Sequence, residues 1–336
     1  MNSYKFLFPR KALGKNVLMK NRGKTLIIIA GPTASGKTAV AAALARKING
    51  EIVSADSRQV YRHLDIGTNK TGVWNPETRT RVTEGIPQHL TDIIDPSETF
   101  SAGTFVREAR EIIQKIREKG AVPILTGGTG LYFTALIDGL AEMPESVPAV
   151  RAELNEELSS KGIEHLYCRL KDVDPAAAEK NRQNPQRLIR ALEIYILSGT
   201  PPTELQKSTH PSPDATYWFG LDWPREELYA AIDRRSAAML DRGMIEETRA
   251  ALNLGFSAES PGLQGIGYRD IVQYLKGGTD RETLREKLSL DTRHYAKRQL
   301  TWFRGEKRVR WFPVTAASWS AERIGDEIGI HLGNVI

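Results

Sequence analysis

A phosphate-binding loop constrains this chain more than any other feature. Residues 31–38 read GPTASGKT and match the pattern G-x-x-x-x-G-K-S/T without a gap. The loop lies between the apolar run TLIIIA (25–30), which predicts a buried parallel strand, and a run of helix formers that begins at about residue 35. Glycines let backbone N–H groups converge on phosphate oxygens, and the helix N-terminus adds partial positive charge. The motif predicts a polyphosphate site and leaves open what the phosphates are attached to.

The chain continues the alternation of strand and helix that the loop begins. Helices are predicted at 104–120, 224–254 and about 280–304. Further strands are predicted at 51–56, 121–126, 216–223 and 308–314. Strands that alternate with helices form a parallel sheet with right-handed crossovers. We therefore predict an α/β fold: a P-loop NTPase-like parallel sheet with helices on both faces.

The chain of 336 residues is longer than one ordinary core needs, so an insertion or a second domain is expected. Residues 140–208 show helical patterns punctuated by prolines and no strand pair, which predicts a mainly helical insertion. The core is then 25–139 together with 209–315, and residues 316–336 are treated as a C-terminal tail. Residues 1–24 are predicted to be a disordered basic extension, with Met19 as a plausible alternative start.

The net charge of +6 does not by itself indicate nucleic acid. Residues 1–24 hold seven basic and no acidic residues, which leaves 40 basic and 41 acidic residues in the remainder. The body of the chain is therefore nearly neutral, and any RNA-binding surface must be argued from local patches.

The cysteine count and the hydropathy of the sequence indicate the cellular compartment in which the protein works. Cys168 is the single cysteine, which excludes an internal disulfide framework and suits a reducing cytosol. No apolar run is long enough to span a membrane. We expect a cytoplasmic protein without a membrane partner, and a monomer.

Two further features follow strands and so should lie at the same sheet edge as the loop. Asp56 ends the predicted strand 51–56, where it could bind Mg²⁺, accept a proton, or simply cap the following turn. A second Gly-Thr turn, GGT at 127–129, follows the strand 121–126. Lys37 adds a full positive charge to the loop, and the Thr38 hydroxyl could hold Mg²⁺. On these residues alone, a small-molecule or nucleotide kinase with Asp56 as base ranks first.

Two predicted helices carry basic clusters. Arg187 and Arg190 lie three residues apart on one helix face, and Arg293, Lys297 and Arg304 share a face of another. Residues 281–310 hold ten basic and four acidic residues, with aromatic residues among them. Planar rings can stack on bases, so this second cluster is favoured as an RNA contact over a merely solvated face.

Seven motifs in order give the chain a family resemblance. They are GPTASGKT (31–38), DSRQVYRHLDIGTNK (56–70), QHLTDIIDP (88–96), GGTGLYF (127–133), NPQRLIRALEIYILSGTP (184–201), GIGYRD (265–270) and TRHYAKRQLTWFR (292–304). Together they closely resemble the tRNA dimethylallyltransferases, also called tRNA isopentenyltransferases, over residues 26–313. The resemblance implies transfer of a dimethylallyl group from dimethylallyl diphosphate to N6 of the adenosine immediately 3′ of the anticodon in tRNA, with release of diphosphate. Mg²⁺ is the cofactor that it implies.

The resemblance also implies roles for individual residues. Asp56, Thr129 and Arg235 would be catalytic, with neighbouring Arg234 as an alternative to Arg235. Thr38 would contact Mg²⁺. The diphosphate would be held by Gly31, Pro32, Thr33, Ala34, Ser35, Gly36, Lys37 and Thr38.

The implied tRNA contacts extend over both the core and the insertion, which would clamp the anticodon arm. They are Asp56, Ser57, Arg58, Gln59, Thr129, Arg151, Gln186, Arg187, Leu188, Ile189, Arg190, Gln264, Gly265, Ile266, Gly267, Tyr268, Arg269, Thr292, Arg293, His294, Tyr295, Ala296, Lys297, Arg298 and Gln299.

Some segments depart from the family pattern. Gln88 stands where many members have histidine, residues 71–85 match no family motif, and the extension 1–24 has no counterpart. The kinase remains the main alternative, although the helical insertion is larger than a kinase lid requires. An RNA-binding module that uses the loop as a switch is disfavoured, because the strand 121–126 ends without an acidic residue to position a hydrolytic water.

Overall fold

The computed structural model describes residues 24–141, 143–207, 209 and 211–335. The predicted basic extension lies outside this part, apart from Lys24. The chain divides into two compact units. The first comprises the described residues up to Phe133 and from Pro213 onward, and the second comprises Thr134–Ser212. We refer to them as the core unit and the helical unit.

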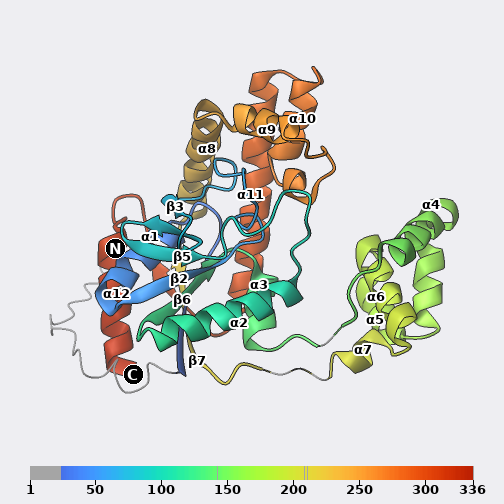
Figure 1. The fold of residues 1–336 in the computed structure, drawn as a ribbon, viewed down its shortest axis with the longest axis horizontal. Helices are drawn as coiled ribbons and strands as arrows, with labels where there is room; N and C mark the ends of the chain where they lie inside the picture. Colours follow the sequence, from blue (N-terminus) through green and yellow to red (C-terminus); the bar gives the residue numbers. More distant parts are fainter. Residues whose placement is uncertain (1–23, 142, 208, 210, 336) are drawn as a thin grey trace, which may run out of the picture. The chain divides into compact units, whose positions relative to one another are not determined.

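The core unit is built on one eight-stranded sheet with the order β3-β4-β5-β2-β6-β1-β7-β8 (Figure 1). The six strands from β5 to β8 are parallel, whereas β4 pairs antiparallel with β3 and β5. Strands β1 and β6 are buried along their whole length, because helices cover both faces of a parallel sheet. The strands are β1 (Thr25–Ala30), β2 (Gly50–Ala55), β3 (Val73–Asn75), β4 (Thr80–Thr83), β5 (Ile86–His89), β6 (Val122–Gly127), β7 (Ala215–Asp222) and β8 (Val309–Pro313). The predicted α/β class and all five predicted strands are confirmed.

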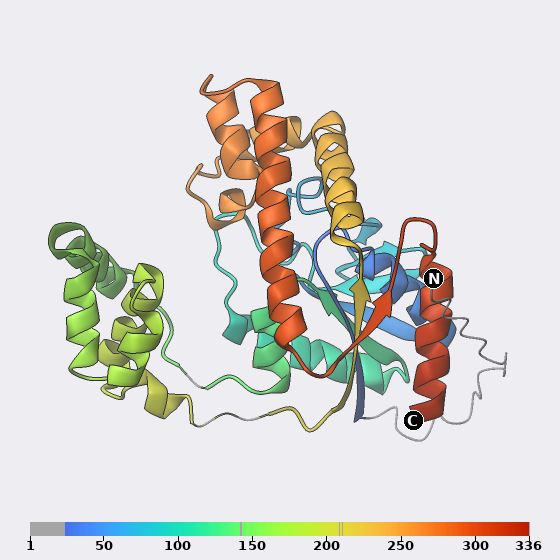
Figure 2. The same cartoon turned by 180° about the vertical axis from the view of Figure 1, so that it is seen from behind.

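The helices of the core unit surround this sheet and extend beyond one of its ends (Figures 1 and 2). The amphipathic α2 is capped by Ser101, whose hydroxyl accepts a hydrogen bond from the Thr104 N–H, and it buries Phe105, Ile113 and Ile116. The helices are α1 (Lys37–Ile48), α2 (Ala102–Glu118), α3 (Gly130–Ile137, which begins in this unit), α8 (Arg225–Asp241), α9 (Met244–Asn253), the short 3₁₀ helix η2 (Pro261–Gln264), α10 (Tyr268–Leu275), α11 (Arg281–Gly305) and α12 (Ala321–Val335).

Packing of α8 against α11 places both helices beside the phosphate loop. Leu228 and Ile232 of α8 are buried with Ala296 of α11, and Ala34 of the loop packs against this cluster. Side chains of α8 and α11 that point toward the loop are therefore held on a rigid support.

The C-terminal segment 316–336 differs from the predicted tail, because it contains α12, which packs along α1 (Figure 2). Ile324, Ile328 and Leu332 recur at helical spacing and join the cluster that also contains Val40 and Leu44 of α1.

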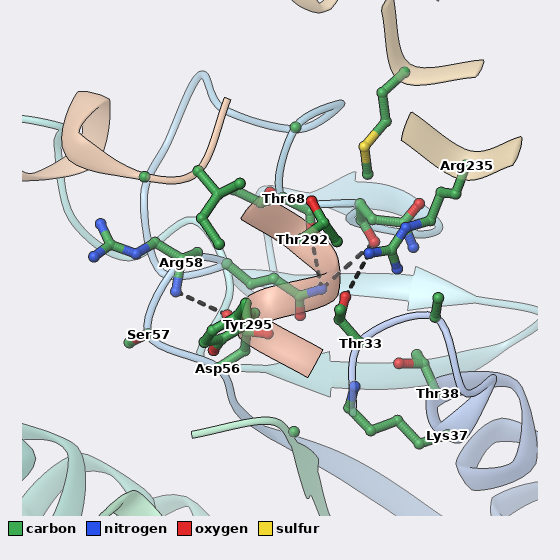
Figure 3. A pocket seen from close by; sticks show the side chains of 18 of the residues that line it. Thr33, Lys37, Thr38, Asp56, Ser57, Arg58, Thr68, Arg235, Thr292 and Tyr295 are labelled. Atoms are coloured by element: carbon green, nitrogen blue, oxygen red, sulfur yellow. Dashed lines mark hydrogen bonds between the residues drawn. The ribbon is translucent and has the colours of Figure 1, made fainter. Parts of the chain in front are cut away.

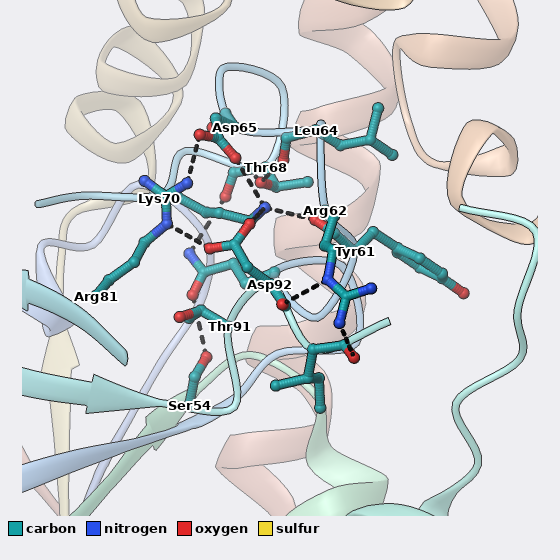
Figure 4. A network of polar contacts seen from close by, with 12 residues as sticks. Ser54, Tyr61, Arg62, Leu64, Asp65, Thr68, Lys70, Arg81, Thr91 and Asp92 are labelled. Atoms are coloured by element: carbon teal, nitrogen blue, oxygen red, sulfur yellow. Dashed lines mark hydrogen bonds and ion pairs between the residues drawn. The ribbon is translucent and has the colours of Figure 1, made fainter. Parts of the chain in front are cut away.

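The hairpin of β3 and β4 was not predicted from the sequence. Val73 is 77% exposed, whereas Arg81 is buried, so the usual alternation of apolar and polar residues is inverted. Arg81 faces inward because it pairs with Asp65 and Asp92, and the fully buried ammonium of Lys70 bonds the same two carboxylates (Figure 4). Burial alone would raise the pKa of Asp65, but the hydrogen bonds from Lys70 and Arg81 outweigh it and lower that pKa. This ion-pair network ties the hairpin to the loop that follows β2.

Glu247 of α9 holds the other end of that loop. Its carboxylate accepts hydrogen bonds from the backbone N–H groups of Asp65, Ile66 and Gly67 at 2.6, 2.7 and 3.1 Å. The Tyr268 hydroxyl donates a fourth, at 2.7 Å. A single carboxylate therefore satisfies three successive backbone donors of the turn.

We expect Glu247→Ala to lower the free energy of unfolding by about 2–4 kcal/mol, because three backbone donors lose their acceptor. Urea denaturation monitored by circular dichroism measures it. Glu246→Ala is the matched control, since the neighbouring carboxylate is 66% exposed and should change stability by less than about 0.5 kcal/mol. If both variants lost the same free energy of unfolding, the negative charge of α9 and not the hydrogen bonds from Glu247 to the turn would account for the loss.

The helical unit is formed by α4 (Pro148–Lys171), α5 (Pro175–Asn181), α6 (Pro185–Ser198) and α7 (Pro202–Leu205). Prolines at the first turns of these helices and side-chain caps from Asp174 and Asn184 explain where they begin. Leu154, Leu166 and Leu188 are among the residues of its core. The regular secondary structure of this unit is all helical within its described residues.

Candidate active site

The phosphate loop connects β1 to α1. Gly36 occupies the left-handed region at φ 83° as the N-cap of α1. A Cβ at this position would lie 2.1 Å from the Trp319 ring, so both the backbone conformation and the packing require glycine. Trp223, whose ring packs against that of Trp319, also supports the loop, because its indole N–H donates to the Ser35 carbonyl at 3.0 Å.

Lys37 lies within the curve of the loop. Its Nζ donates to the Pro32 carbonyl at 3.2 Å. Burial lowers the pKa of Lys37 to about 8, although the attraction of Asp56 opposes this shift and the repulsion of Arg235 adds to it. An ammonium held in this way gains from an anion that enters the loop.

Arg235 reaches the loop from α8. Its Nη2 donates to the Thr33 hydroxyl (Figure 3), and burial lowers its pKa to about 10. Its Nε is buried and has no hydrogen-bond partner within the described part of the chain. Arg234 is exposed, so the structure distinguishes the two neighbouring arginines. A buried donor without an acceptor, on a cation, indicates an anion site.

Asp56 directly follows β2. One oxygen of its carboxylate accepts the Arg58 backbone N–H at 2.8 Å, which shapes the turn, and the other accepts no further bond from the described residues. Thr129, after β6, orients this turn, because its hydroxyl accepts the Ser57 N–H at 3.1 Å. The residues that follow β2 and β6 therefore lie at the same edge of the sheet, as predicted from the sequence.

Lys37, Asp56 and Arg235 line one cavity of about 520 Å³ in the core unit (Figure 3). Its charged lining consists of four cations, Lys37, Arg58, Arg235 and Arg298, and one carboxylate, Asp56. Apolar groups form another part of its wall, namely Ala231, Met239, Ile266 and Leu288. The cavity therefore suits a ligand that joins an anionic head to a hydrocarbon.

Tyr295 of α11 also lines the cavity. Burial, together with the negative charge of Asp56, raises the pKa of Tyr295 to about 12. The phenol therefore stays neutral at physiological pH, with a planar ring available beside the carboxylate.

The structure separates the sequence-predicted site residues into groups. Those that line the cavity are Thr33, Ala34, Gly36, Lys37, Thr38, Asp56, Ser57, Arg58, Gln59, Arg235, Gln264, Gly265, Ile266, Tyr268, Thr292, Tyr295 and Arg298. The remaining loop residues Gly31, Pro32 and Ser35 are buried behind it, and Thr129 acts through Ser57.

Several residues of the predicted tRNA-binding ranges have their side chains engaged within the protein. Ala296 and Gln299 are buried in α11, which leaves them no surface for RNA. Arg293 forms a two-point ion pair with Asp233. Gly267, Arg269, His294 and Lys297 lie in the same ranges but do not line the cavity.

In the helical unit, too, some of the predicted tRNA-binding residues are engaged within the protein and others are exposed. Leu188 and Ile189 belong to its core, so their side chains stabilise the unit and do not face solvent. Arg190 donates to Glu193 and to the Pro144 carbonyl. Gln186 and Arg187 are exposed, and the Arg151 side chain donates to the Ser146 hydroxyl at 3.4 Å. A range drawn from a motif thus contains both packing residues and surface residues.

Sequence reasoning missed part of the cavity wall. Gly67, Thr68 and Asn69 line it, and their position inside the motif 56–70 is the signal that could have identified them. Met239 of α8 and Leu288 of α11 lie outside the recognised motifs, so only the packing of these two helices reveals them.

None of the helices among the described residues is long and apolar enough to cross a membrane. The described residues also contain no group of three or more histidine, cysteine, aspartate or glutamate side chains arranged to hold a metal ion.

Comparison with known proteins places this chain in a family. The model of the IPP transferase family matches residues 59–306, and that of isopentenyl transferase matches residues 24–87. The tRNA dimethylallyltransferase of Endomicrobium trichonymphae is 48% identical over 84% of this chain and 93% of its own length. That of Carboxydothermus hydrogenoformans is 42% identical over 92% and 97%.

Solved structures agree with the sequence comparison. The tRNA isopentenylpyrophosphate transferase of Bacillus halodurans is 38% identical, with a TM-score of 0.66 over 93% of this chain and 96% of that one. A eukaryotic dimethylallyltransferase that acts on tRNA is 28% identical, with a TM-score of 0.77 over 93% and 79%. The chain therefore belongs to the tRNA dimethylallyltransferase family and is an enzyme that prenylates an adenosine of tRNA.

Proposed function

We propose that the cavity binds dimethylallyl diphosphate with its phosphates in the loop 31–38 and its five-carbon group against the apolar wall. The acceptor is N6 of the adenosine immediately 3′ of the anticodon. The observation that carries the proposal is the convergence of Lys37 and Arg235 with Asp56 in one cavity that also has apolar walls. A nucleoside triphosphate would use the cations but would leave Met239 and Leu288 without a role.

Lys37 and Arg235 act on the diphosphate, which is the leaving group of the proposed reaction. As the bond between the allylic carbon and the diphosphate oxygen breaks, the electron pair goes to the departing diphosphate and positive charge develops on the hydrocarbon. Lys37 and Arg235 stabilise the negative charge, and their hydrogen bonds to the loop hold them in place before the reaction. The hydrocarbon receives the N6 lone pair, which forms the new carbon–nitrogen bond.

Asp56 takes the proton that N6 loses. The adenine amine is a weak nucleophile because its lone pair is delocalised into the ring, so a nearby acceptor is needed. The carboxylate oxygen that makes no bond to the turn is available for this contact. Thr129 supports the reaction through Ser57 and the backbone around Asp56.

Mg²⁺ fits the donor set of the loop. Thr38 lines the cavity beside Lys37 and could supply one hydroxyl ligand, and diphosphate oxygens and water would supply the others. Magnesium is commonly bound through few protein groups together with substrate phosphates, so a cluster of carboxylates is not required. When bound, Mg²⁺ would add positive charge where the diphosphate departs.

The tRNA would meet both units. We assign contacts to the cavity residues Ser57–Gln59 and Gln264–Ile266, to Arg298, and to the exposed Gln186 and Arg187 of the helical unit, which we propose binds the anticodon arm. The target base must leave its stack to reach Asp56, and the neutral ring of Tyr295 offers a surface for it. We propose that the enzyme acts as a monomer in the cytoplasm.

A donor test examines this function directly. The full chain is incubated with radiolabelled dimethylallyl diphosphate, Mg²⁺ and an anticodon stem-loop that carries adenosine 3′ of the anticodon. We expect label in the RNA, and none when that adenosine is replaced by guanosine. Transfer of the γ-phosphate of ATP to a small acceptor, with no label in the RNA, would favour the kinase instead.

A further inference from the structure

Gln299 joins the two sides of the active site. It lies on α11, is only 5% exposed, and its side-chain amide bonds two loops that are distant in sequence. Its Oε1 accepts the Thr33 backbone N–H of the phosphate loop at 2.8 Å. Its Nε2 donates to the Gly128 carbonyl of the Gly-Thr turn at 2.9 Å. Both ends of one buried amide are therefore used within the protein.

The contact between Gln299 and Gly128 requires a residue without a side chain at position 128. A Cβ on Gly128 would lie 2.0 Å from the Gln299 Nε2, far inside contact distance. The absence of a side chain at Gly128 allows the amide to reach the backbone of the turn. The two residues form a matched pair across 171 positions of sequence.

A short series of bonds continues from Gly128 to Asp56. The next residue, Thr129, donates its N–H to the Ala55 carbonyl at 3.2 Å, and its hydroxyl accepts the Ser57 N–H at 3.1 Å. These two contacts lie on either side of Asp56. The position of the turn therefore sets the position of the carboxylate.

At its other end, the Gln299 side chain contacts the phosphate loop, which is also held by hydrogen bonds at Thr33. Thr33 accepts a hydrogen bond from Arg235 through its hydroxyl and donates one to Gln299 through its N–H. This limb of the loop is thus fixed between α8 and α11. Because Gln299 uses the Thr33 N–H, the Thr33 hydroxyl is the polar group of this residue that can still donate to a ligand in the loop.

We propose that Gln299 is a positioning residue that sets the spacing between the leaving-group site and Asp56. This role rests on the proposed function of the two loops. Attack of N6 on the allylic carbon requires both reactants to be held in near-attack geometry, and errors of about 1 Å cost on the order of 10²-fold in rate. Gln299 provides a direct side-chain bridge between the phosphate loop and the Gly-Thr turn at 127–129. That turn contacts the backbone on either side of Asp56.

Two substitutions test the bridge by steady-state kinetics. Gln299→Met keeps the length of the side chain but removes both hydrogen bonds, and Gln299→Glu keeps the shape but removes the donor. We expect each to lower kcat at least tenfold at pH 8, while the KM for tRNA and its Kd change by less than twofold. Gln114→Glu on the exposed face of α2 is the control for the same chemical change and should retain wild-type kcat.

The pH profile of Gln299→Glu separates positioning from a general loss of stability. When protonated, the introduced carboxyl has one acceptor oxygen and one O–H donor, so it reproduces both bonds of the amide. When ionised, it places negative charge against the Gly128 carbonyl. The ratio of variant to wild-type kcat should therefore rise as the pH falls from 8 to 6, whereas for Gln299→Met it should stay constant.

Three outcomes would overturn the proposal. One is a normal kcat in both variants, and another is an unchanged kcat with weakened tRNA binding, which would make Gln299 an RNA contact. The third is a pH-independent ratio for Gln299→Glu. A wild-type enzyme that transfers no label would instead overturn the proposed function, together with the role built on it.

Discussion

Asp56→Asn is expected to reduce turnover by roughly 10²–10⁴-fold, the usual range for loss of a general base. The amide matches the carboxylate in shape, and its oxygen can still accept the Arg58 N–H that shapes the turn. The fold of the site should therefore survive, while the amide cannot accept the proton of N6. Single-turnover transfer from labelled donor measures the rate, and filter binding measures tRNA affinity, which should stay within about twofold.

Asp241→Asn on α8 is the matched control, because this carboxylate is 73% exposed and forms a surface ion pair with Arg281. It should behave as wild type in both assays. If Asp56→Asn lowered tRNA binding as much as turnover, Asp56 would be a residue that positions the RNA and not the base.

Lys37→Met should lower kcat by roughly 10²–10³-fold, because a preorganised charge at the departing diphosphate is lost. Methionine keeps much of the side-chain volume and cannot bond the Pro32 carbonyl or the ligand. Lys115→Met on the exposed side of α2 removes a similar charge far from the loop and should leave kcat unchanged. A loss of similar size in both variants would indicate an effect of net charge on tRNA association.

The lowered pKa of Lys37 also predicts how donor affinity depends on pH. In the empty site Lys37 loses its proton as the pH rises through about 8, whereas bound diphosphate favours the ammonium. Binding above this pH must therefore take up a proton, so the Kd for dimethylallyl diphosphate should rise between pH 7.5 and 9.5. Isothermal titration calorimetry measures this rise, which Lys37→Met should abolish. A parallel rise in the variant would assign it to another group.

Local patterns were sufficient for the elements that obey a simple rule. TLIIIA was predicted as a buried strand because a parallel strand covered on both faces must be apolar throughout. GPTASGKT was predicted as a phosphate loop because its glycines and lysine suffice to make one. The hairpin 73–83 was missed because its inward residue is Arg81, which is stabilised there by Asp65 and Asp92 from other segments.

The candidate site shows the same limit. The sequence was sufficient to predict that Asp56 lies at a strand end and that α11 is basic. Which α11 residues face the cavity was not readable, because Gln299 and Tyr295 belong to the same motif and only one of them lines it. For Arg234 and Arg235 the sequence offered two equal cations, and the packing of α8 turns one toward the loop and the other toward solvent.

By itself, the sequence determined the chemistry that this protein can hold: a loop for phosphates, a carboxylate at the same sheet edge and basic helices for RNA. These properties depend on residue type and short-range spacing. Only the tertiary structure decided how the groups are joined, through the amide bridge of Gln299, the choice of Arg235 and the apolar wall from Met239 and Leu288. Each of these depends on contacts between segments far apart in the chain, whose distances no local pattern specifies.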